Sequence, residues 1–308
     1  MTRNNKVIGF AAGILAAMFY GTNPLGALPL YSHGINSASV LFYRYGLATL
    51  MFALWMLLRR ERFGLRRREL SRLALLGVMM ALSSVTLFEA FHYMDAGLAS
   101  TILFTYPIMV AVLMAVLYHE KASWITVSSI VLATTGIVML NKGGDGHLSA
   151  TGMTLVLISS LLYAFYIIDV KRWQMAYSPV KFTFWVVLTG FITIMAYSLV
   201  MHEPLQVLHG GLEWACGVQL ALLPTVLSLL LMTIAISKIG STPAAIMGAL
   251  EPVTAVTIGV CLFGEAMTMR LAIGILFILG GVILVVTGDR LKSAIHLPHL
   301  LSHKITGR

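Results

Sequence analysis

The chain has 308 residues, of which 58% are hydrophobic and only 11% are charged, and its mean hydropathy is +0.89. Soluble domains are usually about 45–50% apolar and about 25% charged, so this composition excludes an ordinary soluble protein and predicts several membrane-spanning segments. The net charge of +9 arises from basic residues between apolar runs, which argues against nucleic acid as a partner and favours the lipid bilayer. Cys216 and Cys261 both lie inside apolar runs, which excludes a disulfide framework and a CxxC site.

Ten apolar runs of about 20 residues, the length needed to cross about 30 Å of hydrocarbon, follow one another along the chain. Their connections are short and leave no room for a soluble domain. The first run is too long for a cleaved signal peptide, so we expect it to remain as the first helix. The predicted spans are residues 7–28, 38–58, 70–93, 97–118, 123–141, 152–170, 181–201, 214–236, 242–263 and 268–288.

Basic residues fall on alternate connections between these spans. If the N-terminus is cytoplasmic, the inner segments hold 18 of the 21 Lys and Arg residues, and the outer connections hold only Lys142 and Arg270. Arg44 lies within the second span. The excess of positive charge on one side predicts a multi-pass protein of the cell (inner) membrane with both termini in the cytoplasm.

The chain is similar to itself when it is shifted by 145 residues, so that residues 90–143 align with residues 235–288. A shift of 143 residues also places Tyr20 on Tyr163. We therefore expect two five-helix repeats, residues 7–141 and 152–288, followed by a cytoplasmic tail at residues 289–308. Because five is odd, the second repeat must enter the membrane from the opposite side, as in many secondary transporters. The identical pairs include Pro107 with Pro252, Glu120 with Glu265, and Gly136 with Gly281.

Two stretches carry a specific resemblance: YPIMVAVLMAVLYHEKASWITVSSIVLATTG, from residue 106, and EPVTAVTIGVCLFGEAMTMRLAIGILFILGG, from residue 251. In each, a glutamate follows the proline and a glycine follows the glutamate at the same spacing. This pattern resembles the EamA-type repeat of the drug/metabolite transporter superfamily, over about residues 7–288. The resemblance implies an all-α membrane protein of ten helices in two inverted halves, with a central cavity lined mainly by helices 1, 3, 4, 6, 8 and 9.

Glu251 lies near the middle of the ninth span, where an ionisable group costs about 2.5–3.5 kcal/mol on insertion scales. Pro252 removes the usual hydrogen-bond donor of the Gly248 carbonyl, so one interpretation is that a neutral glutamate repairs a helix kink. The other is that Glu251 faces a wet cavity, where it contacts solute or exchanges a proton. The first repeat has Tyr106 at the equivalent position and keeps Pro107, so a kink alone does not require glutamate.

Arg44 and Glu89 lie at similar depths in the second and third spans, toward their outer ends. They form a candidate ion pair, although two separately snorkelling side chains would give the same pattern. Glu89, His92 and Asp95 recur every third residue and share one helix face, which makes Glu89 and His92 further candidates for proton coupling. No HExxH spacing supports a metal site.

The first span contains FYGTNPLGALP and its counterpart contains LYAFYIID. Tyr20 and Tyr163 are candidates for a symmetric pair that faces the solute, with interfacial anchoring as the alternative. We expect Pro24, Pro107 and Pro252 to kink their helices, because prolines at membrane depth are tolerated beside a cavity. The full set of candidate substrate-binding residues is Tyr20, Asn23, Phe104, Tyr106, Tyr163, Met247 and Glu251.

Four residues duplicated between the repeats are expected to be structural. Glu120 and Glu265 begin the connections to the fifth and tenth spans, where a carboxylate favours a helix N-terminus. Gly136 and Gly281 belong to small-residue faces on those two spans, which would allow the helices to pack closely.

The resemblance implies export of amino acids or other small metabolites, or exchange of phosphorylated sugars and nucleotides. The apolar and tyrosine-rich candidate cavity has no cluster of Lys and Arg for two phosphates, which favours an uncharged or zwitterionic solute. A lipid flippase and a non-transport membrane protein are the remaining alternatives. An enzyme is not expected, because the only midplane carboxylate is solitary. No cofactor is implied, a proton is a candidate second partner, and the sequence does not specify an oligomeric state.

Overall fold

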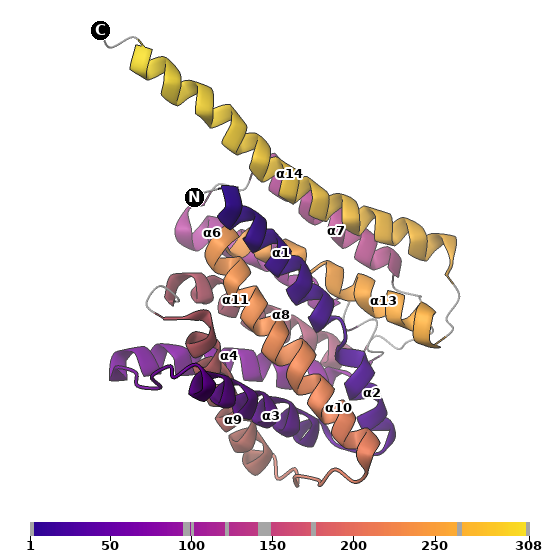
Figure 1. The fold of residues 1–308 in the computed structure, drawn as a ribbon. Coiled ribbons are helices and arrows are strands. Elements are labelled where there is room, and N and C mark those ends of the chain that lie inside the picture. Colours follow the sequence, from indigo (N-terminus) through magenta and orange to yellow (C-terminus); the bar gives the residue numbers. More distant parts are fainter. Residues whose placement is uncertain are drawn as a thin grey trace.

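The computed structural model describes residues 3–94, 99, 102–120, 123–140, 149–173, 177–263 and 267–305. Within these ranges every regular element is a helix, which agrees with the predicted all-α fold. Figure 1 shows the helices as one bundle. In chain order they are α1 (Arg3–Tyr20), α2 (Asn23–Ser32), α3 (Ser37–Leu58), α4 (Arg67–Ala90), α6 (Tyr106–Tyr118), α7 (Trp124–Leu140), α8 (Ala150–Trp173), α9 (Pro179–Val200), α10 (Gly211–Ala221), the π-helical turn η2 (Leu222–Leu227), α11 (Ser228–Ile239), α12 (Ser241–Met247), α13 (Leu250–Phe263) and α14 (Met269–Ile305).

Helix length and composition agree with a multi-pass membrane protein. Among the described residues, seven helical segments are long and apolar enough to cross a membrane, and α6 and α7 are shorter apolar helices. Large apolar side chains also point outward, for example Leu50, Val116 and Leu276, each 65% exposed. Apolar side chains on the outside of a helical bundle are stable in lipid, because hydrocarbon is as apolar as they are.

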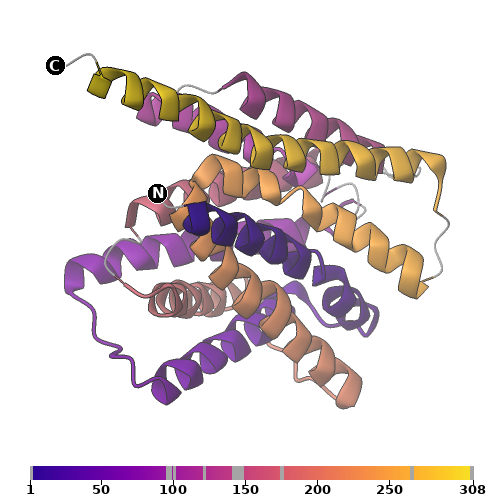
Figure 2. The same ribbon diagram turned by 45° about the horizontal axis from the view of Figure 1, so that its top comes forward.

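Helices α7 and α14 pack side by side along one edge of the bundle (Figures 1 and 2). The two backbones approach closely because Gly136 of α7 lies against Gly274 of α14. A Cβ on Gly136 would lie 2.5 Å from the Gly274 carbonyl oxygen, and a Cβ on Gly281 would lie 2.7 Å from the Ser129 carbonyl oxygen. Helix α14 then continues to Ile305, and Pro298 lies within this continuous helix.

Three of the predicted spans are interrupted by short turns. Helix α1 ends at Tyr20 and α2 begins at Asn23, whereas α12 ends at Met247 and α13 begins at Leu250. In the fourth span, α6 begins at Tyr106 directly after two turn residues. These turns replace the single long helices that hydropathy predicted.

The prolines Pro24, Pro107 and Pro252 correct a second expectation, that of helix kinks. Each lies in the first turn of the helix that follows an interruption. The first N–H groups of a helix have no intrahelical acceptor, so proline removes no backbone hydrogen bond there. The prolines therefore start new helices after a break and do not bend a continuous one.

The eighth span contains the π-helical turn η2 between α10 and α11. Pro224 lies within it, and the Thr225 hydroxyl donates a hydrogen bond of 2.8 Å to the Leu220 carbonyl, five residues earlier. A π-turn holds one more residue per turn than an α-helix, so it rotates the side chains that follow relative to those that precede it.

A network of polar contacts joins the segment after α2 to the segment before α10, and we call it the α2–α10 clasp. His33 Nδ1 pairs with Glu213 Oε1 at 2.9 Å. The Asn36 N–H donates to Gln206 Oε1 at 2.6 Å, and the Gln206 N–H donates to the Ser39 hydroxyl at 2.8 Å. These bonds tie together one end of the bundle between residues more than 160 positions apart in the chain.

Candidate functional site

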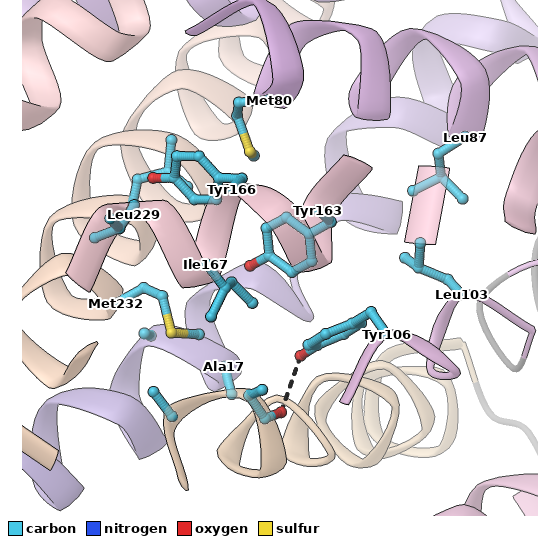
Figure 3. Close-up of a cluster of buried hydrophobic side chains, with 14 of the residues drawn as sticks. Ala17, Met80, Leu87, Leu103, Tyr106, Tyr163, Tyr166, Ile167, Leu229 and Met232 are labelled. Atoms are coloured by element: carbon cyan, nitrogen blue, oxygen red, sulfur yellow. Dashed lines mark hydrogen bonds between the residues drawn. The ribbon is translucent and has the colours of Figure 1, made fainter. Parts of the chain in front are cut away.

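Four tyrosines meet where the interrupted helices converge. Tyr163 on α8 lies between Tyr106 and Tyr166 in Figure 3, with ring centroids 4.8 Å from Tyr106 and 5.9 Å from Tyr166. The ring of Tyr20, the last residue of α1, stacks on Tyr163 at 6.4 Å with an interplanar angle of 19°. The structure thus brings together the two tyrosines that the sequence predicted as a pair.

The break between α12 and α13 makes room for one of these tyrosines. The Tyr106 hydroxyl donates a hydrogen bond of 3.2 Å to the Ala245 carbonyl, the dashed line in Figure 3. A Cβ on Gly248 would overlap that hydroxyl, so glycine is needed there for steric reasons. A phenol has one proton to donate, and here the Ala245 carbonyl accepts it.

Glu251 lies in the first turn of α13, beside these tyrosines. Its backbone N–H donates to the Gly248 carbonyl at 2.9 Å, so the carbonyl that the sequence left without a donor is already satisfied by the main chain. The Glu251 Oε1 atom is buried and has no hydrogen-bond partner among the described residues. A buried polar atom without a partner is unusual and requires a ligand, water or function to explain it. Repair of the backbone does not account for this side chain.

Arg44 on α3 is fully buried, and aromatic rings surround its guanidinium group. Its Cζ atom lies 5.5 Å from the ring centroid of Tyr20 and 5.8 Å from those of Tyr45 and Phe88. These distances allow cation–π attraction. Its Nε–H donates to the Thr225 hydroxyl on η2 at 2.8 Å. On the other side of this segment, the backbone of Glu251 packs against Gly21, the residue after Tyr20.

The predicted ion pair between Arg44 and Glu89 is not formed. Arg44 Nη1 and Nη2 and Glu89 Oε1 are all buried without a hydrogen-bond partner in the described part of the chain. The guanidinium group instead faces η2 and the rings, whereas Glu89 interacts with Tyr197 on α9. A similar position along neighbouring spans does not fix the direction in which a side chain points.

His92 lies apart from the tyrosines, near the α2–α10 clasp. Its Nε2 atom is 3.0 Å from the Ser37 hydroxyl, and its ring is 5.8 Å from that of Tyr31. Asp95, predicted on the same face, lies outside the described residues. Across the residues that the structure does describe, no group of three His, Cys, Asp or Glu side chains could hold a metal ion.

The remaining candidate substrate residues lie around the same junctions. Phe104 packs edge-on against Tyr106 at 5.5 Å, and Met247 is fully buried at the end of α12, near Gly13 of α1. The Oδ1 atom of Asn23, the first residue of α2, is buried without a partner in the described structure. Whether these side chains touch a solute stays a prediction.

Two of the four residues predicted to be structural lie in a helix–helix contact away from the tyrosines. Gly136 and Gly281 lie in the contact between α7 and α14. Glu120 is exposed just after the end of α6, and Glu265 lies outside the described residues.

Thr225, Tyr45 and Phe88 are site residues that the sequence analysis did not identify. Their roles depend on the rotation of α3 and α4 and on the π-turn, which hydropathy does not report. Pro224 inside the eighth span is the signal that could have indicated an irregular turn, since proline in the middle of a regular helix removes a backbone hydrogen bond.

The chain matches the model of the EamA-like transporter family twice, over residues 7–142 and 150–287. It is similar to an uncharacterized transporter from Archaeoglobus fulgidus, with 27% identity over 90% of this chain and 95% of that protein. It is also 27% identical to uncharacterized transporter sll1319 from Synechocystis sp., over 62% of this chain and 59% of that relative's length.

A solved crystal structure has the same fold, with a TM-score of 0.74 over 93% of this chain and 99% of that one. The two sequences are 17% identical, so the likeness concerns the arrangement of the helices alone.

Proposed function

Because this chain belongs to the EamA-like transporter family, we propose that it is a secondary transporter that exports small organic metabolites, such as amino acids, by alternating access. The observation that carries this proposal is Glu251. Its carboxyl is buried without a partner for Oε1, at a helix break and beside three tyrosines. Interrupted helices near the midplane are where many secondary transporters bind solute and coupling ion.

The proposed architecture is ten transmembrane helices in two inverted repeats, residues 7–141 and 152–288, with residues 289–308 as a cytoplasmic tail. The double family match supports it. Helix packing supports it as well. The first span packs on the eighth as α1 on α11, and the third packs on the sixth as α4 on α8. Exchanging the two repeats converts one of these contacts into the other, as a two-fold relation requires.

We further propose that the protein lies in the inner membrane with both termini in the cytoplasm. The positive-inside distribution of Lys and Arg supports this orientation. A reporter enzyme that is active only outside the cytoplasm should work when fused after residue 145 or residue 208. It should fail after residue 65 or residue 175. Activity after residue 65 would reverse the orientation.

The solute is expected to carry at most one anionic group. Arg44 is the only fully buried Lys or Arg in the described part of the chain, whereas organic phosphates usually need several cations or donors. This favours amino acids over nucleotide sugars and sugar phosphates. The solute touches both repeats in this scheme, because Tyr20 and Tyr106 come from the first repeat and Tyr163 and Glu251 from the second.

Proton coupling would use Glu251, and glutamine tests this role. Glutamine keeps the shape and a hydrogen-bonding oxygen but cannot release a proton. In proteoliposomes with an imposed pH gradient, Glu251→Gln should bind amino acid yet lose proton-driven accumulation. Glu120→Gln is the matched control, because Glu120 is exposed and should leave accumulation unchanged. Normal pH-dependent accumulation by Glu251→Gln would show that this carboxyl is not the coupling group.

A further inference from the structure

Arg44 is a fully buried cation, and no carboxylate of the described residues forms a salt bridge with it. Its two terminal nitrogens, Nη1 and Nη2, have no hydrogen-bond partner among the described residues. Burying a charge is costly unless it is paired, and removing one partner of a buried pair leaves that cost uncompensated. An ionisable residue inside a membrane bundle is therefore a candidate functional group whose partner must be identified.

The surroundings of Arg44 hold the guanidinium group in place while leaving one edge unpaired. Nε is bonded to Thr225 at 2.8 Å, and the Thr225 hydroxyl is itself fixed by its bond to the Leu220 carbonyl. The rings of Tyr20, Tyr45 and Phe88 surround the group within 5.8 Å of Cζ. The two nitrogens left over form the fork that binds a carboxylate through two parallel hydrogen bonds.

We propose that Arg44 is the subsite for the carboxylate group of the transported solute. The inference rests on the proposed function and narrows it to zwitterionic solutes such as apolar α-amino acids. Arg44 Cζ lies 5.5 Å from the Tyr20 ring centroid, and the backbone of Glu251 packs against Gly21, the next residue in the chain. A cation and an acid therefore lie near the same end of α1. That arrangement complements a molecule with one carboxylate and one ammonium group, and the surrounding tyrosines suit an apolar side chain.

The test compares amino acids with their amides on the purified full-length chain in lipid nanodiscs. L-Leucine, L-methionine and L-phenylalanine are titrated beside their primary amides, which keep the ammonium group and side chain but replace the carboxylate with a neutral group. We expect the amides to bind about 10- to 100-fold more weakly, as for loss of a hydrogen-bonded charged group. This comparison needs no variant, so it holds even if changes at Arg44 impair folding.

Arg44→Gln then assigns the preference to this residue. It should weaken binding of the acids to the level of the amides and leave binding of the amides unchanged, so that the ratio of the two affinities falls to about one. Arg44→Lys keeps the charge without the fork and should retain part of the preference. A purely structural role for Arg44 would lower both affinities together and leave their ratio intact.

Three results would overturn the inference. Equal binding of acids and amides by the unmodified chain is one, and an unchanged preference in folded Arg44→Gln is another. In both cases, efflux of these solutes from proteoliposomes would leave the proposed transport function standing. If none of the acids or amides binds or is transported, the proposed amino-acid function fails, and the carboxylate subsite fails with it.

Discussion

The contact between α7 and α14 leaves no space for even a methyl group, whereas the junctions of α1 with α2 and of α12 with α13 leave buried polar atoms unpaired. At the first contact, glycines let two continuous backbones touch. At the junctions, helices stop and restart, and Glu251 Oε1 and Asn23 Oδ1 lack partners in the described structure. Thr134 is the single such residue on the described parts of α7 and α14.

This difference separates a tightly packed contact, which tolerates no added atoms, from junctions whose unpaired polar atoms are suited to bind a ligand. Continuous helices satisfy their own backbone groups, so a lipid-embedded pair can be packed entirely by van der Waals contact. Interrupted helices expose backbone and polar side chains to the interior, and such groups are stable only when a ligand, water or neighbouring side chain completes them. The following changes test that division.

Gly248→Ala should have the largest effect, because its methyl group would collide with the Tyr106 hydroxyl and displace the ring. We expect the transport rate to fall by about a hundredfold, as when a functional group is misplaced by about 1 Å. Adding Tyr106→Phe removes the colliding oxygen and should recover part of the rate. The measurement is solute efflux from proteoliposomes. If the double variant is slower than Gly248→Ala alone, the collision is not the cause.

Gly281→Ala should destabilise the α7–α14 contact, because its Cβ would lie 2.7 Å from the Ser129 carbonyl oxygen. Overpacking of this kind costs about 2 kcal/mol of unfolding free energy. The neighbouring Gly280 has no atom within 4 Å of its added Cβ, so Gly280→Ala is a control on the same helix. Thermal unfolding of the two variants in one detergent gives the comparison. Equal melting temperatures would mean that the contact tolerates a methyl group.

Thr225→Val should leave Arg44 Nε without its partner while preserving the shape of the side chain. Losing a hydrogen bond to a charged group costs about 1.5 kcal/mol. We expect this cost to appear as a weaker affinity for amino acid. Thr257→Val is the control, because that exposed hydroxyl bonds only to its own helix, at the Val253 carbonyl. Calorimetric titration of both variants measures the effect, and identical affinities would show that η2 does not position Arg44.

The smallest expected effect is the coupling free energy between Arg44→Gln and Glu89→Gln. Since the two side chains do not pair, their costs in unfolding free energy should add to within about 0.5 kcal/mol in the double variant. The single variants and the double variant are compared by denaturant or thermal unfolding. A coupling above about 1 kcal/mol would revive the ion pair that the sequence suggested.

Sequence reasoning identified the class of protein and selected tyrosines that lie close together in the structure. Hydropathy predicted an all-helical membrane protein, and the duplicated proline, glutamate and glycine pattern resembled the EamA family, which the family match confirms. Tyr20 and Tyr163 were chosen as a pair, and their rings are stacked. The helical class and the family were predictable because they depend on composition, on periodicity and on self-similarity, which are local or duplicated features of the chain. That the two tyrosines face a solute stays a prediction.

The helix breaks and the partners of Arg44 were not predictable in the same way. The sequence does not distinguish a proline that bends a helix from one that begins a helix. At Pro107 and Pro252 the outcome depends on the packing of Tyr106 against Gly248. Arg44 reaches Thr225 because η2 rotates that residue toward α3. Helix rotation and π-turns arise from tertiary packing, so a hydropathy window cannot report them.

The α2–α10 clasp determines how much free energy is needed to separate α2 from α10. Any motion that separates α2 from α10 must break the pairing of His33 with Glu213 and release Gln206 from Asn36. Each such bond contributes about 0.5–1.5 kcal/mol net, so the few that make up the clasp bias the two-state population by a few powers of ten at most. A solute would have to bind the opened form more tightly than the closed form by this amount to open the clasp.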